Sequence, residues 1–201
     1  MKKFLLGAVL GFLVLMSFNQ ANATVLTFDD LTSGYYDDIN VYGGLNWYNF
    51  GVFRKDYDKY VNNAVVSGNF AAVSNMHGQY DSYIYSTNGT FDFTGAYLTS
   101  YHFSENPMTF IGRLNGQIIY QNTFTVSNQT PTAIQLNYMD IDRLDVIAGH
   151  VNNSSGEYVC MDNFTINEPF NGNPIPTPEP TSAILMLFGG IGSVLLKKSR
   201  K

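Results

Sequence analysis

The chain holds a single cysteine, Cys160, so no disulfide can form within it. Histidine is also sparse: the three histidines are isolated, and no His-x-x-x-His pair of the kind that binds zinc is present. A Gly-x-Ser-x-Gly elbow, which marks the nucleophile of many serine hydrolases, is missing as well. These absences exclude a disulfide-stabilised scaffold and leave the sequence without a recognisable catalytic or zinc motif.

Basic residues are scarce in the central part of the chain. Residues 24–172 contain five Lys and Arg against fifteen Asp and Glu, a formal charge of −10, whereas the two ends carry the other six cations. A body this acidic argues against binding to nucleic acid or to anionic membrane surfaces. It is compatible with bound cations, with neutral glycans, and with one domain large enough to bury its own core.

The N-terminus has the three parts of a secretory signal peptide. Two lysines precede an apolar run at residues 4–18, and the small residues Ala21 and Ala23 lie where signal peptidase would cleave. We therefore expect residues 1–23 to be removed after export begins. The alternative is an uncleaved membrane helix.

The C-terminus combines a Pro-rich linker at residues 173–182, an apolar stretch at residues 183–196 and a basic end at residues 197–201. A helix over the apolar stretch would be roughly 21 Å long, whereas a comfortable membrane span needs about 20 residues. The basic end is expected to stay in the cytoplasm. The pattern predicts a short transmembrane helix, which could serve as a plain tail anchor.

The linker carries Pro178, Glu179 and Pro180 directly ahead of the apolar stretch. This order of motif, short apolar helix and basic end resembles the PEP-CTERM sorting signal. The resemblance implies an exosortase-type processing enzyme as partner, which would remove the tail much as a GPI signal is removed. It implies export through the inner membrane to the cell surface or extracellular matrix, with transient or permanent anchoring in the membrane.

The domain at residues 24–172 reads as short alternating runs of β-branched and aromatic residues, separated by Gly, Asn, Asp, Ser and Pro. Asn115 and Gly116 between two apolar runs predict a tight hairpin. No helical apolar stripe occurs outside the two terminal segments. The pattern predicts an all-β fold, an antiparallel β-sandwich or jelly roll, with Cys160 buried in its last strand. The expected strands cover residues 25–29, 45–53, 64–67, 70–73, 83–85, 90–93, 96–103, 108–114, 117–126, 132–137, 143–148 and 158–166.

Four segments mark the length of this domain: LTFDDL at residues 26–31, YGGLNWYNF at residues 42–50, FDFTGAYL at residues 91–98 and MDNFTI at residues 161–166. Their order resembles a family of secreted β-sandwich domains for which no activity is established. The resemblance implies a galactose-binding-like jelly roll and leaves the activity open.

Acidic residues at the two ends of the domain are candidates for a structural calcium site. The first and last strands of a jelly roll commonly lie side by side, which would bring Asp29 and Asp30 close to Asp162. Calcium prefers carboxylate and carbonyl oxygens as ligands. The alternative is that Asp30 caps a turn and that Asp162 accepts hydrogen bonds from backbone at a sheet corner.

Aromatic residues crowd the first third of the domain. Tyr35, Tyr36 and Tyr42 lie in an expected loop at residues 35–42, and flat rings beside Asn and Asp are how sugars are commonly held. These tyrosines are the candidate ligand-binding residues, with solvation or packing as the alternative. The strand aromatics that follow are expected to fill the core: Trp47, Phe50 and Phe53.

The sequence as a whole predicts an exported, non-catalytic surface or matrix protein whose sandwich mediates adhesion or binds extracellular polysaccharide. One alternative is a structural matrix component without a specific ligand. Another is a secreted glycan hydrolase, whose paired acids only the fold could bring together.

Overall fold

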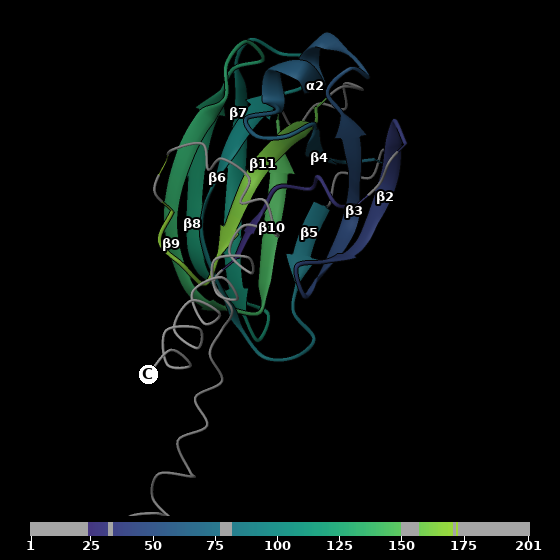
Figure 1. Cartoon of the computed structure of the whole chain (residues 1–201). Helices are drawn as coiled ribbons and strands as arrows, with labels where there is room; N and C mark the ends of the chain where they lie inside the picture. Colours follow the sequence, from purple (N-terminus) through teal and green to yellow (C-terminus); the bar gives the residue numbers. More distant parts are fainter. Residues whose placement is uncertain (1–23, 32–33, 77–81, 150–156, 171, 173–201) are drawn as a thin grey trace, which may run out of the picture.

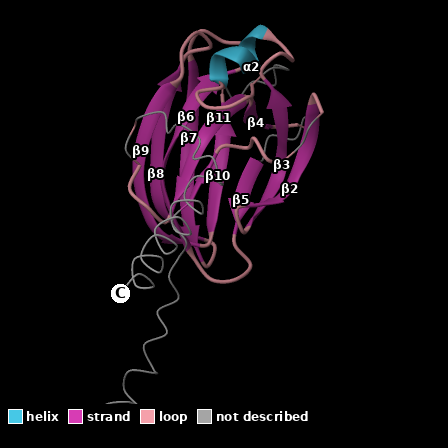
Figure 2. Cartoon of the chain, viewed as in Figure 1, coloured by secondary structure: helices cyan, strands magenta, loops and turns pink. Residues whose placement is uncertain are grey.

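The computed structural model describes residues 24–31, 34–76, 82–149, 157–170 and 172. Within these residues the chain forms eleven strands and one short helix, and every strand pairing is antiparallel (Figure 1, Figure 2). The predicted antiparallel all-β class is confirmed. The elements are β1 (Thr24–Leu26), β2 (Tyr36–Tyr42), β3 (Leu45–Arg54), α2 (Lys59–Ala64), β4 (Phe70–Ser74), β5 (Ser82–Tyr85), β6 (Phe91–Ser100), β7 (Asn106–Leu114), β8 (Gln117–Val126), β9 (Thr132–Ile141), β10 (Arg143–Ala148) and β11 (Val159–Ile166).

The two terminal segments, predicted as a signal peptide at residues 1–23 and as a linker, apolar helix and basic end at residues 173–201, lie outside the described residues. In the part of the chain that the structure describes, no helix is long and apolar enough to cross a membrane.

The strands form one hydrogen-bonded path, β8-β7-β10-β5-β3-β4-β11-β6-β9, which folds over into two facing layers (Figure 1). Strand β3 belongs to both layers, because residues 46–48 pair with β5 whereas residues 50–54 pair with β4. Strand β2 pairs with the other edge of β3, and β1 pairs with β11. The first and last strands therefore lie side by side, as the sequence predicts.

Aromatic rings from both layers meet in the core between them. Phe93 of β6 stacks on Phe164 of β11 with ring centroids 4.6 Å apart, and lies 5.8 Å from Phe110 of β7 in the opposite layer. Trp47 of β3 contacts Phe164 edge-on at 5.2 Å and donates its indole N–H to the carbonyl of Tyr42 at 3.0 Å. Burial of each such ring contributes about 1.5–3 kcal/mol, so these rings hold the layers together. All three predicted core aromatics are buried: Trp47, Phe50 and Phe53.

A second, smaller apolar cluster lies on the outer face of β3, β4 and β11. Because successive residues of a strand face opposite sides, Val52 belongs to the central core whereas Phe53 belongs to this outer cluster. Helix α2 covers the cluster with Val61 and Ala64, and Cys160 of β11 is completely buried there. The predicted burial of Cys160 is confirmed.

The hairpin between β7 and β8 turns at Asn115 and Gly116, whose φ angles are 52° and 78°. Both values are positive, as a primed two-residue turn requires. The predicted hairpin is therefore confirmed in position and in backbone conformation.

The prediction of a loop at residues 35–42 is wrong, because most of this segment forms strand β2. Only Ile39 is buried in this strand, so its sequence lacks the alternation by which a strand is identified. It is held by backbone pairing along β3, which requires no apolar face.

The strand predicted at residues 64–67 is also wrong, because Ala64 ends helix α2. Asp58 begins this helix: its carboxylate accepts the backbone N–H groups of Tyr60 at 2.8 Å and Val61 at 2.9 Å. With six residues, the helix is too short for its sequence to show a helical period.

The strands predicted at residues 90–93 and 96–103 form one strand, β6. Gly95 continues the strand, and a Cβ at this position would lie only 2.5 Å from the carbonyl oxygen of Ile134 on the neighbouring β9. The glycine therefore permits close pairing where the sequence suggests a break.

Substitution Phe164→Ala is expected to lower the free energy of unfolding by about 3–5 kcal/mol, because it leaves a cavity between the two layers. Urea unfolding followed by tryptophan fluorescence measures this loss. The matched surface control is Val41→Ala, whose side chain is 65% exposed; it should change stability by no more than about 0.5 kcal/mol. Equal effects of the two substitutions would show that the stacked rings do not dominate the core.

Candidate functional site

An aromatic cleft of about 240 Å³ opens over the outer apolar cluster. Its floor is formed by Phe53 of β3 and Val73 of β4, whose outward direction follows from strand alternation. The walls come from the segments that leave the ends of β3, β4 and β6 and that enter β11. The described lining residues are Phe53, Tyr57, Val73, Met76, Tyr101, His102 and Tyr158.

The rings of the cleft hold one another mainly by edge-to-face contacts. Tyr57 contacts Phe53 with centroids 4.8 Å apart and planes at 79°. Tyr101 contacts His102 at 4.5 Å and Tyr158 at 5.6 Å in the same manner. Such pairs are favourable beyond the area that they bury, so the cleft has an ordered aromatic wall. Tyr57 is 45% exposed and therefore accessible to a ligand.

Asp58 joins this wall to helix α2. One carboxylate oxygen caps the helix, and the other accepts a hydrogen bond from the Tyr101 hydroxyl. Burial, and then the adjacent carboxylate of Asp58, raises the pKa of Tyr101, so its hydroxyl stays protonated at neutral pH. Both carboxylate oxygens of Asp58 therefore accept hydrogen bonds that hold the helix and the cleft wall together.

The cleft offers an apolar floor, aromatic walls and a few hydroxyl and imidazole groups. This combination suits a ligand with one apolar face and several hydroxyls, such as a sugar ring. Among the described residues that line the cleft there is no carboxylate. The described lining therefore provides no pair of acids for cleavage of a glycosidic bond.

The three tyrosines predicted as ligand-binding residues are not brought together. Tyr36 stacks on Phe53 of the cleft at 5.7 Å and is 59% exposed. The guanidinium carbon of Arg54 lies over the ring of Tyr35, 4.1 Å from the centroid of that ring. Tyr42 packs against Phe28 at the edge of the central core.

Tyr42 has a structural environment. Its hydroxyl donates to Asp30 at 2.6 Å and accepts the backbone N–H of Phe28 at 3.3 Å. Burial, and then its hydrogen bond to Asp30, raises the pKa of Tyr42. Of the three predicted tyrosines, Tyr36 alone adjoins the cleft.

The cleft residues Tyr57, Tyr101 and Tyr158 are not among the ligand-binding residues predicted from the sequence. They are far apart in the chain, and each follows or precedes a strand without any distinctive local pattern. Only the pairing of β11 between β4 and β6 brings their segments to one place.

The residues predicted for calcium lie in two places. Asp162 is fully buried and accepts three backbone N–H groups, from Val66 at 2.7 Å, Ser67 at 2.8 Å and Asn163 at 2.7 Å. Asp30, by contrast, accepts from the Tyr42 hydroxyl.

Asp29 approaches the same segment as Asp162. Its Oδ1 accepts the N–H of Asn69 at 2.6 Å, while its Oδ2 is buried without a hydrogen-bond partner in the described part of the chain. In that part, no group of three or more His, Cys, Asp or Glu side chains is arranged to hold a metal ion. Calcium binding stays a prediction, for which Asp29 Oδ2 is the one uncommitted buried oxygen among the three residues.

A larger hollow of about 470 Å³ is lined by residues of β1, of the turn between β2 and β3, of the connection between β5 and β6, and of the end of β11. Its described lining is mostly polar or glycine, and the one aromatic ring there, Phe91, is itself buried. It offers no exposed ring for stacking, so the aromatic cleft is the stronger candidate. The described lining residues are Thr24, Gly43, Gly44, Leu45, Ser86, Asn88, Thr90, Phe91, Ile166 and Asn167.

No family model matches the chain, and no curated protein matches it in sequence. Among solved structures, the chain is similar to TmCBM61 in complex with β-1,4-galactotriose, with a TM-score of 0.37 and 8% identity over 63% of this chain and 90% of that one. It is similar to the cleaved adhesin domain of Lys-gingipain from Porphyromonas gingivalis, with a TM-score of 0.42 and 10% identity over 75% and 99% of the two chains. A third similarity is to the arabinose-bound α-L-arabinofuranosidase MgGH51, with a TM-score of 0.40 and 13% identity over 79% of this chain and 28% of that one. The candidate site rests on its own geometry.

Asp162 is expected to make stability depend on pH. Burial raises its pKa from 3.8 to about 7, while the three N–H donors act in the opposite direction. A folded-state pKa above the unfolded value means that the stabilising contribution is complete below about pH 4 and is lost as the pH rises through 7. The free energy of unfolding of the wild type, relative to Asp162→Asn, should therefore fall between pH 4 and pH 8.

Chemical unfolding of both proteins across this pH range measures the difference, and the other carboxylates cancel because both proteins share them. The expected slope is at most about 1.4 kcal/mol per pH unit. A wild type that instead gains stability over Asp162→Asn with rising pH would show that the N–H donors outweigh burial.

Proposed function

We propose that the protein is a non-catalytic glycan-binding or adhesion module that acts outside the cell. The observation that carries this proposal is the aromatic cleft over β3, β4 and β11, with an apolar floor and exposed ring surface. A folded, rigid wall of rings reduces the ordering cost of binding. The acidic body, with a charge of −10 over residues 24–172, is compatible with a neutral sugar as ligand.

The cleft explains how a sugar would bind. The C–H face of one sugar ring stacks on Tyr57, the exposed ring of the cleft, and the hydroxyls around it reach the phenol of Tyr158 and the imidazole of His102. At about 240 Å³ the cleft is smaller than most pockets for drug-sized molecules. It therefore suits one or two sugar units of a polysaccharide that extends beyond it.

Substitution Tyr57→Ala is expected to weaken retention on the bound neutral polysaccharide about tenfold, because it removes a stacking surface worth about 1.4 kcal/mol. The measurement is affinity electrophoresis of the purified protein through gels that contain individual plant or bacterial polysaccharides.

The matched control is Tyr35→Ala, which removes a tyrosine that is even more exposed, 57% against 45%, and that does not line the cleft. Its retention should equal that of the wild type. A protein that no polysaccharide retards would contradict glycan binding and favour the structural matrix component. Equal losses in both variants would contradict the cleft as the site.

We also propose that a PEP-CTERM-type tail delivers this sandwich, with an exosortase-type enzyme as its processing partner. The support is the order Pro178-Glu179-Pro180, apolar stretch and basic end, together with the signal-peptide pattern before Thr24. Intact-mass spectrometry of the protein from its native host is expected to show a chain that begins at Thr24 and ends close to Pro180. A mature chain that still ends at Lys201 would contradict removal of the tail and favour a retained anchor.

A further inference from the structure

A row of side chains crosses the outer face of the layer that contains β5, β10 and β7, opposite the layer that carries the aromatic cleft. Tyr48 of β3 and Tyr83 of β5 stack with centroids 4.6 Å apart, and the guanidinium of Arg143 on β10 lies 3.7 Å from the Tyr83 centroid. Asp145 of β10 and Arg113 of β7 continue the row. We call these five residues the tyrosine–arginine row. Leu144 and Val146, which alternate with them on β10, face the core.

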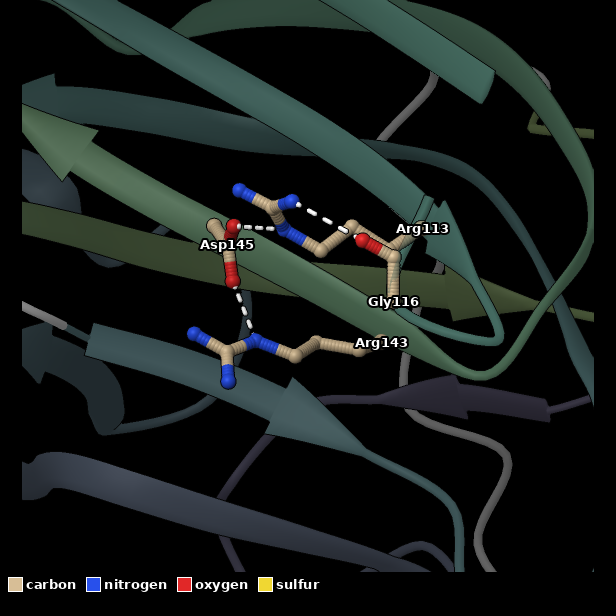
Figure 3. Close-up of polar contacts among 4 residues, drawn as sticks. All are labelled: Arg113, Gly116, Arg143 and Asp145. Carbon is tan, nitrogen blue, oxygen red and sulfur yellow. Dashed lines mark hydrogen bonds and ion pairs between the residues drawn. The ribbon is translucent and has the colours of Figure 1, made fainter. Parts of the chain in front are cut away.

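The two arginines share one carboxylate. Arg113 donates its Nε–H to Asp145 Oδ2 at 2.6 Å, and Arg143 donates its Nε–H to the other oxygen. Figure 3 shows the two guanidinium groups on opposite sides of this carboxylate. Asp145 is 8% exposed in its side chain, against 27% for Arg113 and 38% for Arg143. The carboxylate is thus covered, and the guanidinium groups are what the surface presents.

Pairing through Nε leaves the terminal N–H groups of both arginines for other partners. One terminal nitrogen of Arg113 donates to the carbonyl of Gly116 at 3.3 Å (Figure 3). Across the described residues, the terminal nitrogens of Arg143 have no hydrogen-bond partner. Asp145 and the Tyr83 ring therefore hold the Arg143 guanidinium in place while its outer edge stays unbonded.

This arrangement differs from that of Arg54, the third arginine of residues 24–172. Arg54 uses both Nε and a terminal nitrogen on Asp56, at 2.6 and 2.9 Å, so its fork is already occupied. Asp142, the carboxylate closest in sequence to Arg143, accepts the N–H of Asn115 at 2.6 Å in the β7–β8 hairpin. Two positioned guanidinium groups with one carboxylate between them carry a net charge of +1, a local exception to the charge of −10 over residues 24–172, and form a site for an additional anion.

We propose that the tyrosine–arginine row binds an acidic polysaccharide through a carboxylate or sulfate group. The outer edge of Arg143 matches the two oxygens of such a group, and Arg113 adds a second charge. The row crosses four strands, about 14 Å at the usual strand spacing, so the adjoining sugar lies against the edges of Tyr83 and Tyr48. This site lies on a different layer from the aromatic cleft and does not depend on the proposed function there.

A single site of this kind is weak in water because salt screens exposed charges. A polymer that repeats the anionic group, displayed to many copies of the protein on a surface, converts weak contacts into firm retention. The ligand is therefore expected to be a polyanionic glycan and not a free monosaccharide.

The test is affinity electrophoresis of the full-length protein in gels that contain polygalacturonate, dextran sulfate or neutral dextran. Substitution Arg143→Gln should weaken retention on the anionic polymer at least tenfold. The control Arg54→Gln removes the same charge from a guanidinium that is already occupied, and it should change retention less than twofold. Retention on polygalacturonate alone identifies a carboxylate as the ligand group, and retention on dextran sulfate alone identifies a sulfate.

Two further variants keep the outcome decisive. Tyr48→Ala leaves both ion pairs intact and should weaken retention severalfold, even if Arg143→Gln proves unstable by thermal melting. Tyr35→Ala, which belongs to neither the tyrosine–arginine row nor the cleft, should leave retention on the anionic polymer unchanged. The proposal is overturned if neither anionic polymer retards the wild type, or if Arg143→Gln and Arg54→Gln lose retention equally.

Discussion

Strand β11 is covered on both of its faces, and much of the structure depends on this constraint. All eight of its residues are buried. Toward the inside, Phe164 completes the aromatic core between the layers, and toward the outside Cys160 lies in the cluster under helix α2. Asp162 is tolerated at this depth because three backbone N–H groups bind its carboxylate.

The same alternation that fills the core gives the two layers different outer faces. Outward residues of β3 and β4 are apolar, so helix α2 and the aromatic cleft cover that face. Outward residues of β5, β7 and β10 include a tyrosine, two arginines and an aspartate, which stack on and hydrogen-bond to one another instead. One face therefore suits a neutral ring and the other an anionic group, although both rest on the same core.

The fold could be predicted from the sequence where local chemistry decides it. Asn115 and Gly116 define a hairpin because both tolerate positive φ, and most strands followed from alternating apolar residues. The errors lie where local patterns are weak. Strand β2 is held by pairing with β3 and has one buried residue, and α2 depends on a cap at Asp58 that only six helical residues follow.

The sequence by itself determined the all-β class and the buried aromatics and cysteine, since these depend on alternation and burial. The pairing of the first and last strands was expected only from what is common in jelly rolls. The tertiary structure alone decided which polar and aromatic residues meet. Tyr57, Tyr101 and Tyr158 share a cleft, and Arg113 and Arg143 share Asp145, because strand order places distant segments side by side. Strand order is set by the packing of the whole chain, so no local pattern in the sequence predicts the contacts between these distant residues.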